Sequence, residues 1–562
     1  MKILGINAYY HDSSAAIIEN GNVICAIEEE RLSRKKHDNN FPILSVNKCL
    51  EQTSLNISDI DIVCYYEKPL LKFERILEGI VKHFPKSYKM FIDAIPEWLN
   101  EKIIIEKQIR KKLNYSGKII FSNHHLSHAA AAFYTSNFNK ATVITIDGVG
   151  EYQTTVIWRA NKNKLVSVKE IIYPNSLGLL YSTFTSFLGF EVNEGEYKLM
   201  GLAAYGKPKY LKKVFSLLDV NTDGSFRLIM EYFAFEYKNK MWSKKFEDEF
   251  GLPVKIGQKY TQYYMDLAAS IQKAMEILVL GIVNYSHKIT GNDNLCLGGG
   301  VALNAVINGK IITNSPYKNL FVFGSSGDGG CAIGGALLAS KLFEKRNTTF
   351  QTSLLLGPEY SDMEIQNVLI KKELNYKKIA EDQKVKFTVQ KLIQGKVVAL
   401  FQGKMEFGPR ALGNRSIISS PYPIKQKEIV NKIKIREQFR PFAAVTIDEK
   451  IKTYFNNSTG IDLTMMNTCL TVKEGFKSKI PAVTHIDGTC RVQSVKKDSG
   501  FIYKLTKEFG NRTGTAVLLN TSFNLKGQPL VESPEQAIDT YLKTKIDILV
   551  IGSFVLSKNP IV

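Results

Sequence analysis

Three of the eight histidines in the chain lie within five consecutive positions, 124 to 128. His124 and His128 are four residues apart, a spacing that places two side chains on one face of a helix. The apolar run 118–121 predicts a short strand before them, and the alanines after them favour a helix. Neutral imidazole is a good ligand for divalent transition metals, so this pair indicates part of a metal site. A helix that merely begins with histidines stays an alternative.

A metalloprotease is excluded, because that motif needs a glutamate directly after the first histidine and this chain has His125 there. A third ligand candidate is Asp328, a carboxylate between glycines that follows the apolar run 320–323. Two histidines and one carboxylate form a facial ligand set with open positions. A nucleotide phosphate could occupy those positions.

Residues 3–28 and 141–172 follow the same plan of strand, polar loop and two further strands. Such a repeat predicts an internal duplication. The actin-like fold of sugar kinases and Hsp70-like ATPases is built in this way, with loops whose backbone N–H groups hold nucleotide phosphates. Glycine allows that close approach, although ordinary turns have a similar composition. The candidate phosphate-binding residues are Asp147, Gly148 and Gly150 in one loop, and Gly298, Gly299, Gly300 and Asn304 in another.

The 562 residues suffice for two to four domains, and the composition is that of a globular protein. The seven cysteines form no Cys-x-x-Cys pair, which favours reduced thiols and a cytoplasmic location. There is no signal-peptide pattern and no apolar run of transmembrane length, so no membrane association is expected. The net charge is +20, but the excess lysine is spread along the chain, so a nucleic-acid partner is not expected.

Arginine is concentrated in a C-terminal region that follows a polar stretch near residue 350. The planar guanidinium group matches phosphate and carboxylate oxygens, so this density indicates an anion site. Five of the arginines in this region are Arg410, Arg415, Arg436, Arg440 and Arg491. The domains are therefore predicted as 1–350 and 351–562.

Several motifs together resemble the O-carbamoyltransferases of the NodU and CmcH type, a family that includes TobZ. The resemblance covers essentially the whole chain. The motifs are Gly5 to Asn7 with His11 to Ala16, Glu28 to Arg31, His124 to His128, Gly195 to Gly206, Gly298 to Asn304, Gly327 to Gly330, Gln402 to Ser416, Lys432 to Ala443 with Lys434, His485 to Gln493, and Asn520 to Asn524.

The resemblance implies an α/β protein with two modules. The first is a duplicated actin-like domain (ASKHA, Kae1/TsaD-like), and the second is a YrdC-like α/β domain. In this family a metal, usually iron, is held by the residues that match His124, His128 and Asp328, and Mg²⁺ can accompany ATP. Zinc or manganese would suit the same side chains.

The family's reaction implies that carbamoyl phosphate and ATP give carbamoyl-adenylate and pyrophosphate, after which a hydroxyl of a small molecule or sugar takes the carbamoyl group and AMP leaves. His11, with Asp12 beside it, is the candidate general base, unless it merely hydrogen-bonds within its hairpin. The expected catalytic residues are His11, Asp12, Arg410 and Arg440. Residues expected to bind carbamoyl phosphate or the adenylate are Lys404, Arg410, Arg415, Ser416, Arg436, Arg440, Arg491, Asn520 and Ser522.

Lys198 is a further candidate for nucleotide binding, with the alternative that it forms a buried ion pair with Glu196. Two other functions stay open: transfer to a tRNA, and a non-catalytic ATP-binding switch. The sequence does not identify the hydroxyl acceptor, and it leaves the oligomeric state open, a homodimer included.

Overall fold

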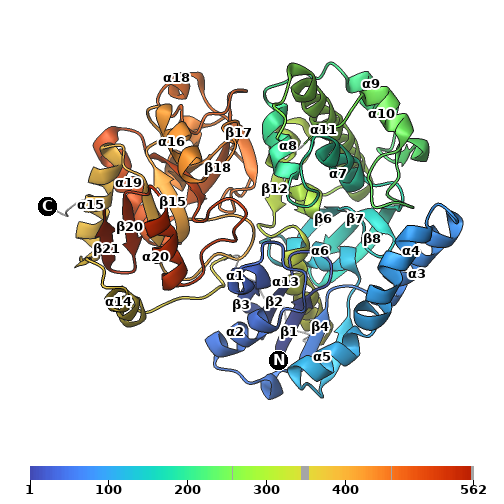
Figure 1. Cartoon of the computed structure of the whole chain (residues 1–562), viewed down its shortest axis with the longest axis horizontal. Coiled ribbons are helices and arrows are strands. Elements are labelled where there is room, and N and C mark those ends of the chain that lie inside the picture. Colours follow the sequence, from blue (N-terminus) through green and yellow to red (C-terminus); the bar gives the residue numbers. More distant parts are fainter. Residues whose placement is uncertain (256, 344–352, 457, 559–562) are drawn as a thin grey trace. The chain divides into compact units, whose positions relative to one another are not determined.

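The structure is a computed structural model that describes residues 1–562 except 256, 344–352, 457 and 559–562 (Figure 1). Its contacts divide the chain into two compact units. Unit 1 consists of Met1–Ile24 and Asn39–Thr352, and unit 2 of Cys25–Asp38 and Ser353–Val562. A short N-terminal segment is thus grouped with the C-terminal part of the chain.

Unit 1 contains two five-stranded sheets with the same topology. The first has the order β3-β2-β1-β4-β5 and the second the order β12-β11-β6-β7-β8. In each sheet the first strand pairs antiparallel with the second and parallel with a later one. This repeat confirms the predicted duplication and the actin-like fold. The strands are β1 (Lys2–Asn7), β2 (Ser14–Glu19), β3 (Asn22–Glu28), β4 (Ile62–Tyr65), β5 (Lys118–Phe121), β6 (Lys140–Ile146), β7 (Gln153–Asn161), β8 (Lys164–Ile172), β11 (Asn294–Gly298) and β12 (Asn319–Val322).

Two helices, α6 (His124–Tyr134) and α13 (Cys331–Phe343), follow the last strand of each sheet and pack against one another. Helix α6 also contacts β6 and β11, whereas α13 contacts β1 and β2. Their contact is close, because a Cβ atom on Gly334 would lie 1.9 Å from the carbonyl oxygen of Ser127. The core of unit 1 therefore holds the start of α6, where the histidines are, next to the start of α13.

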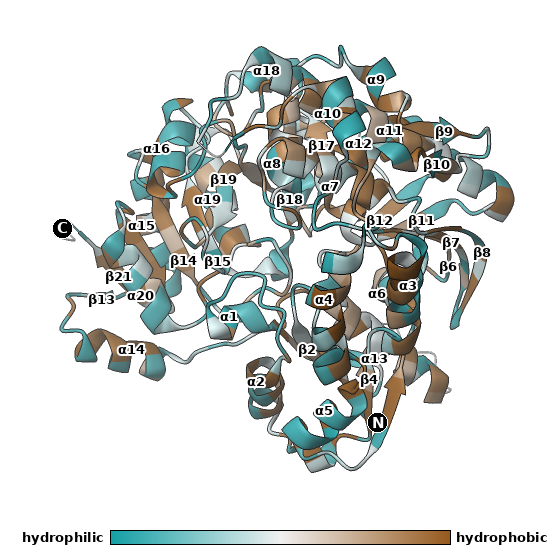
Figure 2. Cartoon of the chain, turned by 45° about the vertical axis from the view of Figure 1, so that its right-hand side comes forward, coloured by the Kyte–Doolittle hydropathy of each residue, from teal (hydrophilic) through white to brown (hydrophobic). Residues whose placement is uncertain are grey.

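A helical insertion lies between β4 and β5 and forms α3 (Pro69–Lys82), α4 (Tyr88–Glu97) and α5 (Ile105–Leu113). Apolar residues are prominent on α3 and α4 in Figure 2. The long helix α11 spans Gln262–Thr290. None of the described helices combines the length and hydropathy needed to cross a membrane. The other regular elements of unit 1 are α2 (Ile43–Thr53), α7 (Leu177–Phe187), α8 (Glu196–Ala203), α9 (Leu211–Phe215), β9 (Leu218–Val220), β10 (Phe226–Leu228), α10 (Lys244–Phe250) and α12 (Ala305–Asn314).

Unit 2 is built on one mixed sheet of nine strands in the order β13-β21-β20-β14-β15-β19-β16-β18-β17. The strands are β13 (Lys377–Lys378), β14 (Val398–Phe401), β15 (Arg415–Ser419), β16 (Ala443–Ile447), β17 (Thr468–Thr471), β18 (Thr489–Val495), β19 (Val517–Ser522), β20 (Ile548–Ile551) and β21 (Phe554–Ser557). The helices are α1 (Glu29–Ser33), α14 (Asp362–Lys371), α15 (Glu381–Ile393), α16 (Lys425–Ile433), α17 (Ile451–Tyr454), α18 (Glu474–Lys477), α19 (Phe501–Thr513) and α20 (Pro534–Lys543).

The central strands of unit 2 are buried on both faces. In β14, Ala399 and Phe401 belong to one hydrophobic cluster, and Val398 and Leu400 to another. Side chains alternate between the faces of a strand, so a continuous apolar run is what a sheet covered on both sides requires. This packing fixes the strands and loops that carry the predicted arginines, with Arg415 at the start of β15 and Arg491 in β18.

Candidate functional site

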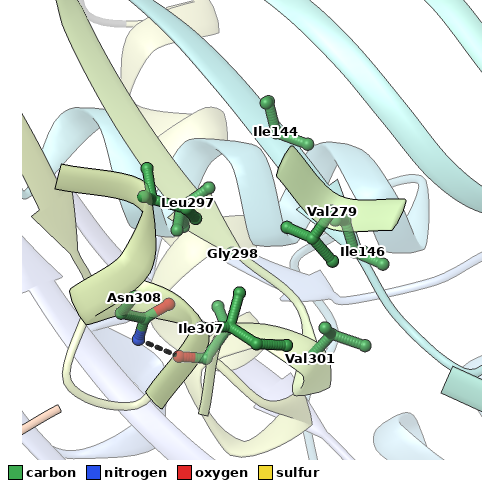
Figure 3. Close-up of a pocket in the computed structure, with 10 residues that line it drawn as sticks. Ile144, Ile146, Val279, Leu297, Gly298, Val301, Ile307 and Asn308 are labelled. Carbon is green, nitrogen blue, oxygen red and sulfur yellow. Dashed lines mark hydrogen bonds between the residues drawn. The ribbon is translucent and has the colours of Figure 1, made fainter. Parts of the chain in front are cut away.

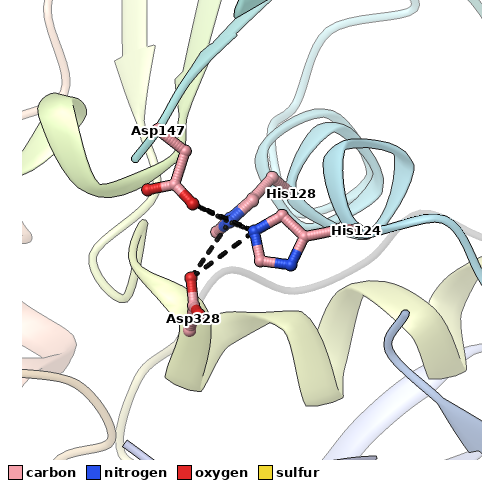
Figure 4. Close-up of side chains that lie close together, drawn as sticks. All are labelled: His124, His128, Asp147 and Asp328. Atoms are coloured by element: carbon pink, nitrogen blue, oxygen red, sulfur yellow. Dashed lines mark hydrogen bonds and ion pairs between the residues drawn. The ribbon is translucent and has the colours of Figure 1, made fainter. Parts of the chain in front are cut away.

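Four buried side chains meet at the start of α6 (Figure 4). His124 and His128 project from the helix, Asp147 follows β6, and Asp328 begins the turn before α13. One ligand atom from each lies within 4.8 Å of all the others. His124 Nε2 is 2.9 Å from Asp147 Oδ2 and 3.1 Å from His128 Nε2, and His128 Nε2 is 3.4 Å from Asp328 Oδ1. The structure thus brings the three predicted metal ligands together and adds a fourth.

Asp147 was predicted to bind nucleotide phosphate, and its position among the ligand atoms was missed. The signal was present, since Asp147 follows a strand end just as Asp328 does. Strands β6 and β12 are both parallel to β11 in the second sheet, so the two strand ends lie at the same edge of that sheet. Asp147 also accepts a hydrogen bond from the backbone N–H of Gly300 through its other oxygen at 2.8 Å.

The cluster has the chemistry of a divalent metal site. Two carboxylates and two imidazoles are the donors that suit iron, zinc or manganese. Burial lowers the pKa of His124, but the carboxylates of Asp328 and Asp147 outweigh it and raise that pKa to about 9. Burial raises the pKa of Asp147, yet hydrogen bonds with the two histidines hold it well below its usual range. The buried carboxylates therefore require positive charge, which a metal ion could supply in place of protons.

Other groups contact the far nitrogen of each imidazole. His124 Nδ1 lies 3.7 Å from Glu67, and Glu67 is paired with Lys72 at 2.7 Å. His128 Nδ1 lies 3.3 Å from the thiol of Cys331. Such partners fix which nitrogen faces a metal. In both histidines Nε2 is the atom turned toward Asp147 and Asp328.

His11 lies beside this cluster. Its Nδ1 is 2.8 Å from Asp12 and its Nε2 is 3.8 Å from Asp328 Oδ2, while its side chain is 21% exposed. Burial lowers its pKa, but Asp328 and Asp12 outweigh that effect and raise the pKa to about 9. The predicted pair of His11 and Asp12 is therefore adjacent to the cluster and reachable from solvent.

The glycine loops are also close to the cluster. A Cβ on Gly150 would lie 3.1 Å from His124 Cβ, and one on Gly298 would lie 3.0 Å from the carbonyl oxygen of His128. Gly299 has φ +86°, which favours glycine. Gly148 has open space beside it, with nothing within 4 Å of a Cβ built there. Glycine at positions 150 and 298 thus allows the loops to pack directly against the start of α6, whereas Gly148 faces open space.

Two predicted nucleotide residues have other partners. Asn304 caps α12 by accepting the N–H of Ile307 at 3.2 Å, and its amide donates to Gln272 at 3.0 Å. Lys198 lies 3.9 Å from Glu194. Glu196 instead accepts a hydrogen bond from Ser182, so the ion pair considered between residues 196 and 198 is not among the described interactions.

A small apolar pocket lies behind the glycine turn (Figure 3). Asn308 is the lining residue with a polar side chain. The amide of Asn308 donates to the carbonyl oxygen of Ala302 at 2.8 Å. The pocket belongs to the packing beneath the loop. Its lining residues are Ile144, Ile146, Val279, Leu297, Gly298, Val301, Ala302, Ile307, Asn308 and Ile311.

In unit 2, two partly exposed arginines lie near the buried Lys434. Its ammonium donates to the carbonyl oxygen of Asn524 at 2.9 Å and contacts Ser522. Burial, followed by the charges of Arg436 and Arg440, lowers the pKa of Lys434 well below its usual range. Arg440 also pairs with Glu437 at 3.7 Å, so one carboxylate faces this group of three cations. The excess of positive charge makes the cluster a candidate anion site.

Arg491 extends this group of cations. Burial lowers its pKa, and Arg440 lowers it further. Its Nε atom is buried without a hydrogen-bond partner, and no ion pair involving Arg491 occurs among the described residues. Nearby, Asn520 donates to the carbonyl oxygen of Ala411 at 3.0 Å. Arg491 is thus a guanidinium group that protein carboxylates do not neutralise.

The remaining predicted binders differ in exposure. Lys404 is exposed, and Arg410 is partly exposed at the same loop. Ser416 accepts the N–H of Gly413 at 3.0 Å. Glu406 organises the loop, because one of its oxygens accepts the N–H groups of Leu412, Asn414 and Arg415 at 2.8, 2.8 and 3.1 Å.

Arg415 is fully buried. Its guanidinium group donates to the carbonyl oxygens of Gln402 and Pro358 at 2.7 and 3.1 Å and lies 3.7 Å from the centroid of the Phe401 ring. Burial lowers its pKa to about 10. These contacts indicate that Arg415 has a structural role and stabilises the loop from beneath. Its position in the sequence did not indicate this role.

Replacing Arg415 with Met is therefore expected to lower the free energy of unfolding by about 2–4 kcal/mol, because buried carbonyl groups lose their donors. Urea denaturation followed by circular dichroism would measure the change. Arg512→Met is the matched control, since Arg512 is a surface residue paired with Glu508 at 2.8 Å. Equal stability of the two variants would contradict the structural role of Arg415.

The segment 25–38 supports the same loop within unit 2. Arg31 donates to the carbonyl oxygen of Gly408 at 2.8 Å, and Glu28 accepts the N–H of Gly408. Arg34 donates to the carbonyl oxygens of Leu530 and Pro529. The motif at residues 28–31 thus holds the backbone of the loop that carries Arg410.

Comparison with known proteins assigns both parts of the chain to one kind of protein. The model of the carbamoyltransferase N-terminus matches residues 2–337, and that of the carbamoyltransferase C-terminus matches residues 389–558. An uncharacterized protein of Synechocystis sp. is 40% identical over 99% of this chain and 97% of its own length.

Two nodulation proteins are also similar. Nodulation protein NolNO of Sinorhizobium fredii is 33% identical over 98% of this chain and 80% of its own length. Nodulation protein NolO of Bradyrhizobium diazoefficiens is 32% identical over 78% of this chain and 79% of its own length.

Proposed function

The chain belongs to the carbamoyltransferase family, and from this premise we propose that it uses ATP to transfer a carbamoyl group to a hydroxyl of a small molecule or sugar. The observation that carries the proposal is the buried cluster of His124, His128, Asp147 and Asp328 beside His11. The cation group of unit 2 supports a separate activation step.

The activation step takes place at the cations of unit 2. Water first cleaves carbamoyl phosphate to carbamate and phosphate. A carbamate oxygen then attacks the α-phosphorus of ATP, the bond to the β-phosphate bridge breaks, and carbamoyl-adenylate and pyrophosphate form. This step joins two anions, so it needs positive charge to offset their repulsion and to align them. Arg440 and Arg491 supply that charge, and Lys434 holds the neighbouring loop at Asn524.

The transfer step takes place at the cluster of unit 1. The acceptor hydroxyl attacks the carbamoyl carbon, the bond from that carbon to the AMP oxygen breaks, and AMP leaves with its phosphate charge. The neutral form of His11, which its raised pKa confines to alkaline pH in the metal-free protein, accepts the hydroxyl proton at Nε2, while Asp12 holds Nδ1 at 2.8 Å. His124, His128, Asp147 and Asp328 would hold a divalent metal, which when bound would act as a Lewis acid toward the phosphate.

The nucleotide phosphate is expected to lie against backbone N–H groups of the loops at Gly148–Gly150 and Gly298–Gly300. The absence of side chains at these glycines allows the approach. Iron is the metal that the family suggests, and metal analysis of the purified protein would identify it.

Metal removal separates the two steps. Treatment with a chelator is expected to stop formation of carbamoylated product, because the transfer cluster loses its Lewis acid, while pyrophosphate release continues when Mg²⁺ is present. Chromatography with mass detection would follow both products from ATP and carbamoyl phosphate. Retained transfer in metal-free protein would contradict the proposed role of the cluster.

A further inference from the structure

Helix α3 carries two buried cations on one face. Lys72 and Arg75 are three residues apart, so their side chains neighbour one another, and the two residues are 4% and 8% exposed. A buried cation normally has an acidic partner, since an unpaired charge is costly to bury. The two residues differ in this respect.

The charge of Lys72 has an acidic partner, and Lys72 also links α3 to the transfer site. Its ammonium forms an ion pair with Glu67 at 2.7 Å and lies 4.5 Å from the centroid of the Tyr10 ring. Tyr10 in turn lies 4.8 Å from the ring of His11, measured between centroids. The same helix face is therefore connected by direct contacts to the proposed base.

Arg75 has no such partner. Its guanidinium carbon lies 4.9 Å from the centroid of the Tyr173 ring, and its Nε is buried without a hydrogen-bond partner. Among the described residues, Arg75 forms no hydrogen bond and no ion pair. An aromatic face attracts the charge but does not accept all five N–H groups. The side chain thus keeps donors for an oxyanion.

The surroundings of Arg75 leave access for a ligand. Tyr10, His11 and Tyr173 are each only partly buried, so solvent reaches this side of the site. A guanidinium group can form two parallel hydrogen bonds with a carboxylate or phosphate, which fixes both position and orientation. An acceptor bound in this way would be held at one end by Arg75 while its hydroxyl approaches His11.

We propose that the hydroxyl acceptor carries an anionic group, a carboxylate or a phosphate, that Arg75 binds. This inference rests on the proposed carbamoyl transfer and adds the substrate class to it. Neutral polyols and sugars are then poor acceptors, because they leave the buried guanidinium group without an anion.

The test compares acceptors that share a hydroxyl framework and differ in charge. The pairs are glucose with glucose 6-phosphate, glucose with glucuronate, and glycerol with glycerate or glycerol 3-phosphate. The full-length, metal-loaded protein receives ATP, carbamoyl phosphate and one acceptor, and carbamoylated product is quantified by mass spectrometry. Pyrophosphate is measured in the same samples. At least one anionic member is expected to exceed its neutral partner by about tenfold or more in kcat/KM, and the carboxylate and phosphate arms identify which anion is preferred.

Arg75→Gln is expected to reduce the ratio of kcat/KM between the anionic and the neutral acceptor to about one. Arg75→Lys keeps the charge but loses the planar pair of N–H donors, so it is expected to retain part of that ratio. Arg227→Gln, a change of an exposed arginine, serves as the control that keeps the full ratio. Thermal unfolding of each variant checks that it folds.

The outcomes separate the two proposals. If wild-type protein forms no pyrophosphate from carbamoyl phosphate and ATP, the proposed function itself fails. If pyrophosphate forms but no anionic acceptor surpasses its neutral partner, or Arg75→Gln keeps the preference, the inference about Arg75 is overturned. An equal loss with both members of each pair also overturns it, since that pattern indicates contact with the nucleotide.

Discussion

Asp147→Asn and Asp328→Asn are each expected to reduce carbamoyl transfer by about 10²- to 10³-fold, the size typical of losing one preorganised electrostatic group. Each change removes a negative charge from the buried cluster, where Asp147 Oδ2 lies 2.9 Å and Asp328 Oδ1 3.7 Å from His124 Nε2. The metal content of the purified variants should fall together with transfer. Pyrophosphate formation should persist, because it belongs to unit 2.

Asp293→Asn is the matched control, since Asp293 is an exposed carboxylate paired with Lys318 at 2.9 Å. Metal analysis and product quantification on all three variants give independent readouts. Normal metal content and normal transfer in Asp147→Asn would show that Asp147, the fourth side chain of the cluster, is no part of the site.

Arg491→Gln is expected to reduce pyrophosphate formation by a similar factor, about 10²- to 10³-fold. The buried Nε of Arg491 has no protein partner, so its charge is available to an anionic substrate. The apparent KM for either carbamoyl phosphate or ATP should rise. The substrate whose KM rises is the one that Arg491 contacts.

Arg512→Gln is the control for this change, because Arg512 lies in the same unit and pairs with Glu508. Circular dichroism would confirm that both variants are folded. Unchanged pyrophosphate formation in Arg491→Gln would contradict the assignment of this cation group to the activation step.

Much of the fold was predictable from local patterns. The duplication was visible because each half repeats a strand, a polar loop and two strands, and the structure has matching sheet orders for both halves. The i, i+4 histidine pair was equally visible, since α6 begins at His124 and includes His128.

The partners of buried charges were not predictable, because they come from distant parts of the chain. Asp147 was assigned to a phosphate loop, and only the packing of β6 against α6 shows that it meets His124. In the sequence, nothing distinguished Arg415 from the other arginines of the C-terminal region. In the structure, backbone carbonyl groups enclose its guanidinium group. The sequence of the insertion between β4 and β5 did not indicate that Arg75 faces Tyr173.

The most direct test of the account is the release of pyrophosphate from ATP by the purified protein without an acceptor. The account predicts that pyrophosphate forms only when carbamoyl phosphate is present, with one phosphate released for each pyrophosphate and an AMP-containing product of the mass of carbamoyl-adenylate. Formation of ADP instead, or pyrophosphate release that does not depend on carbamoyl phosphate, would contradict it.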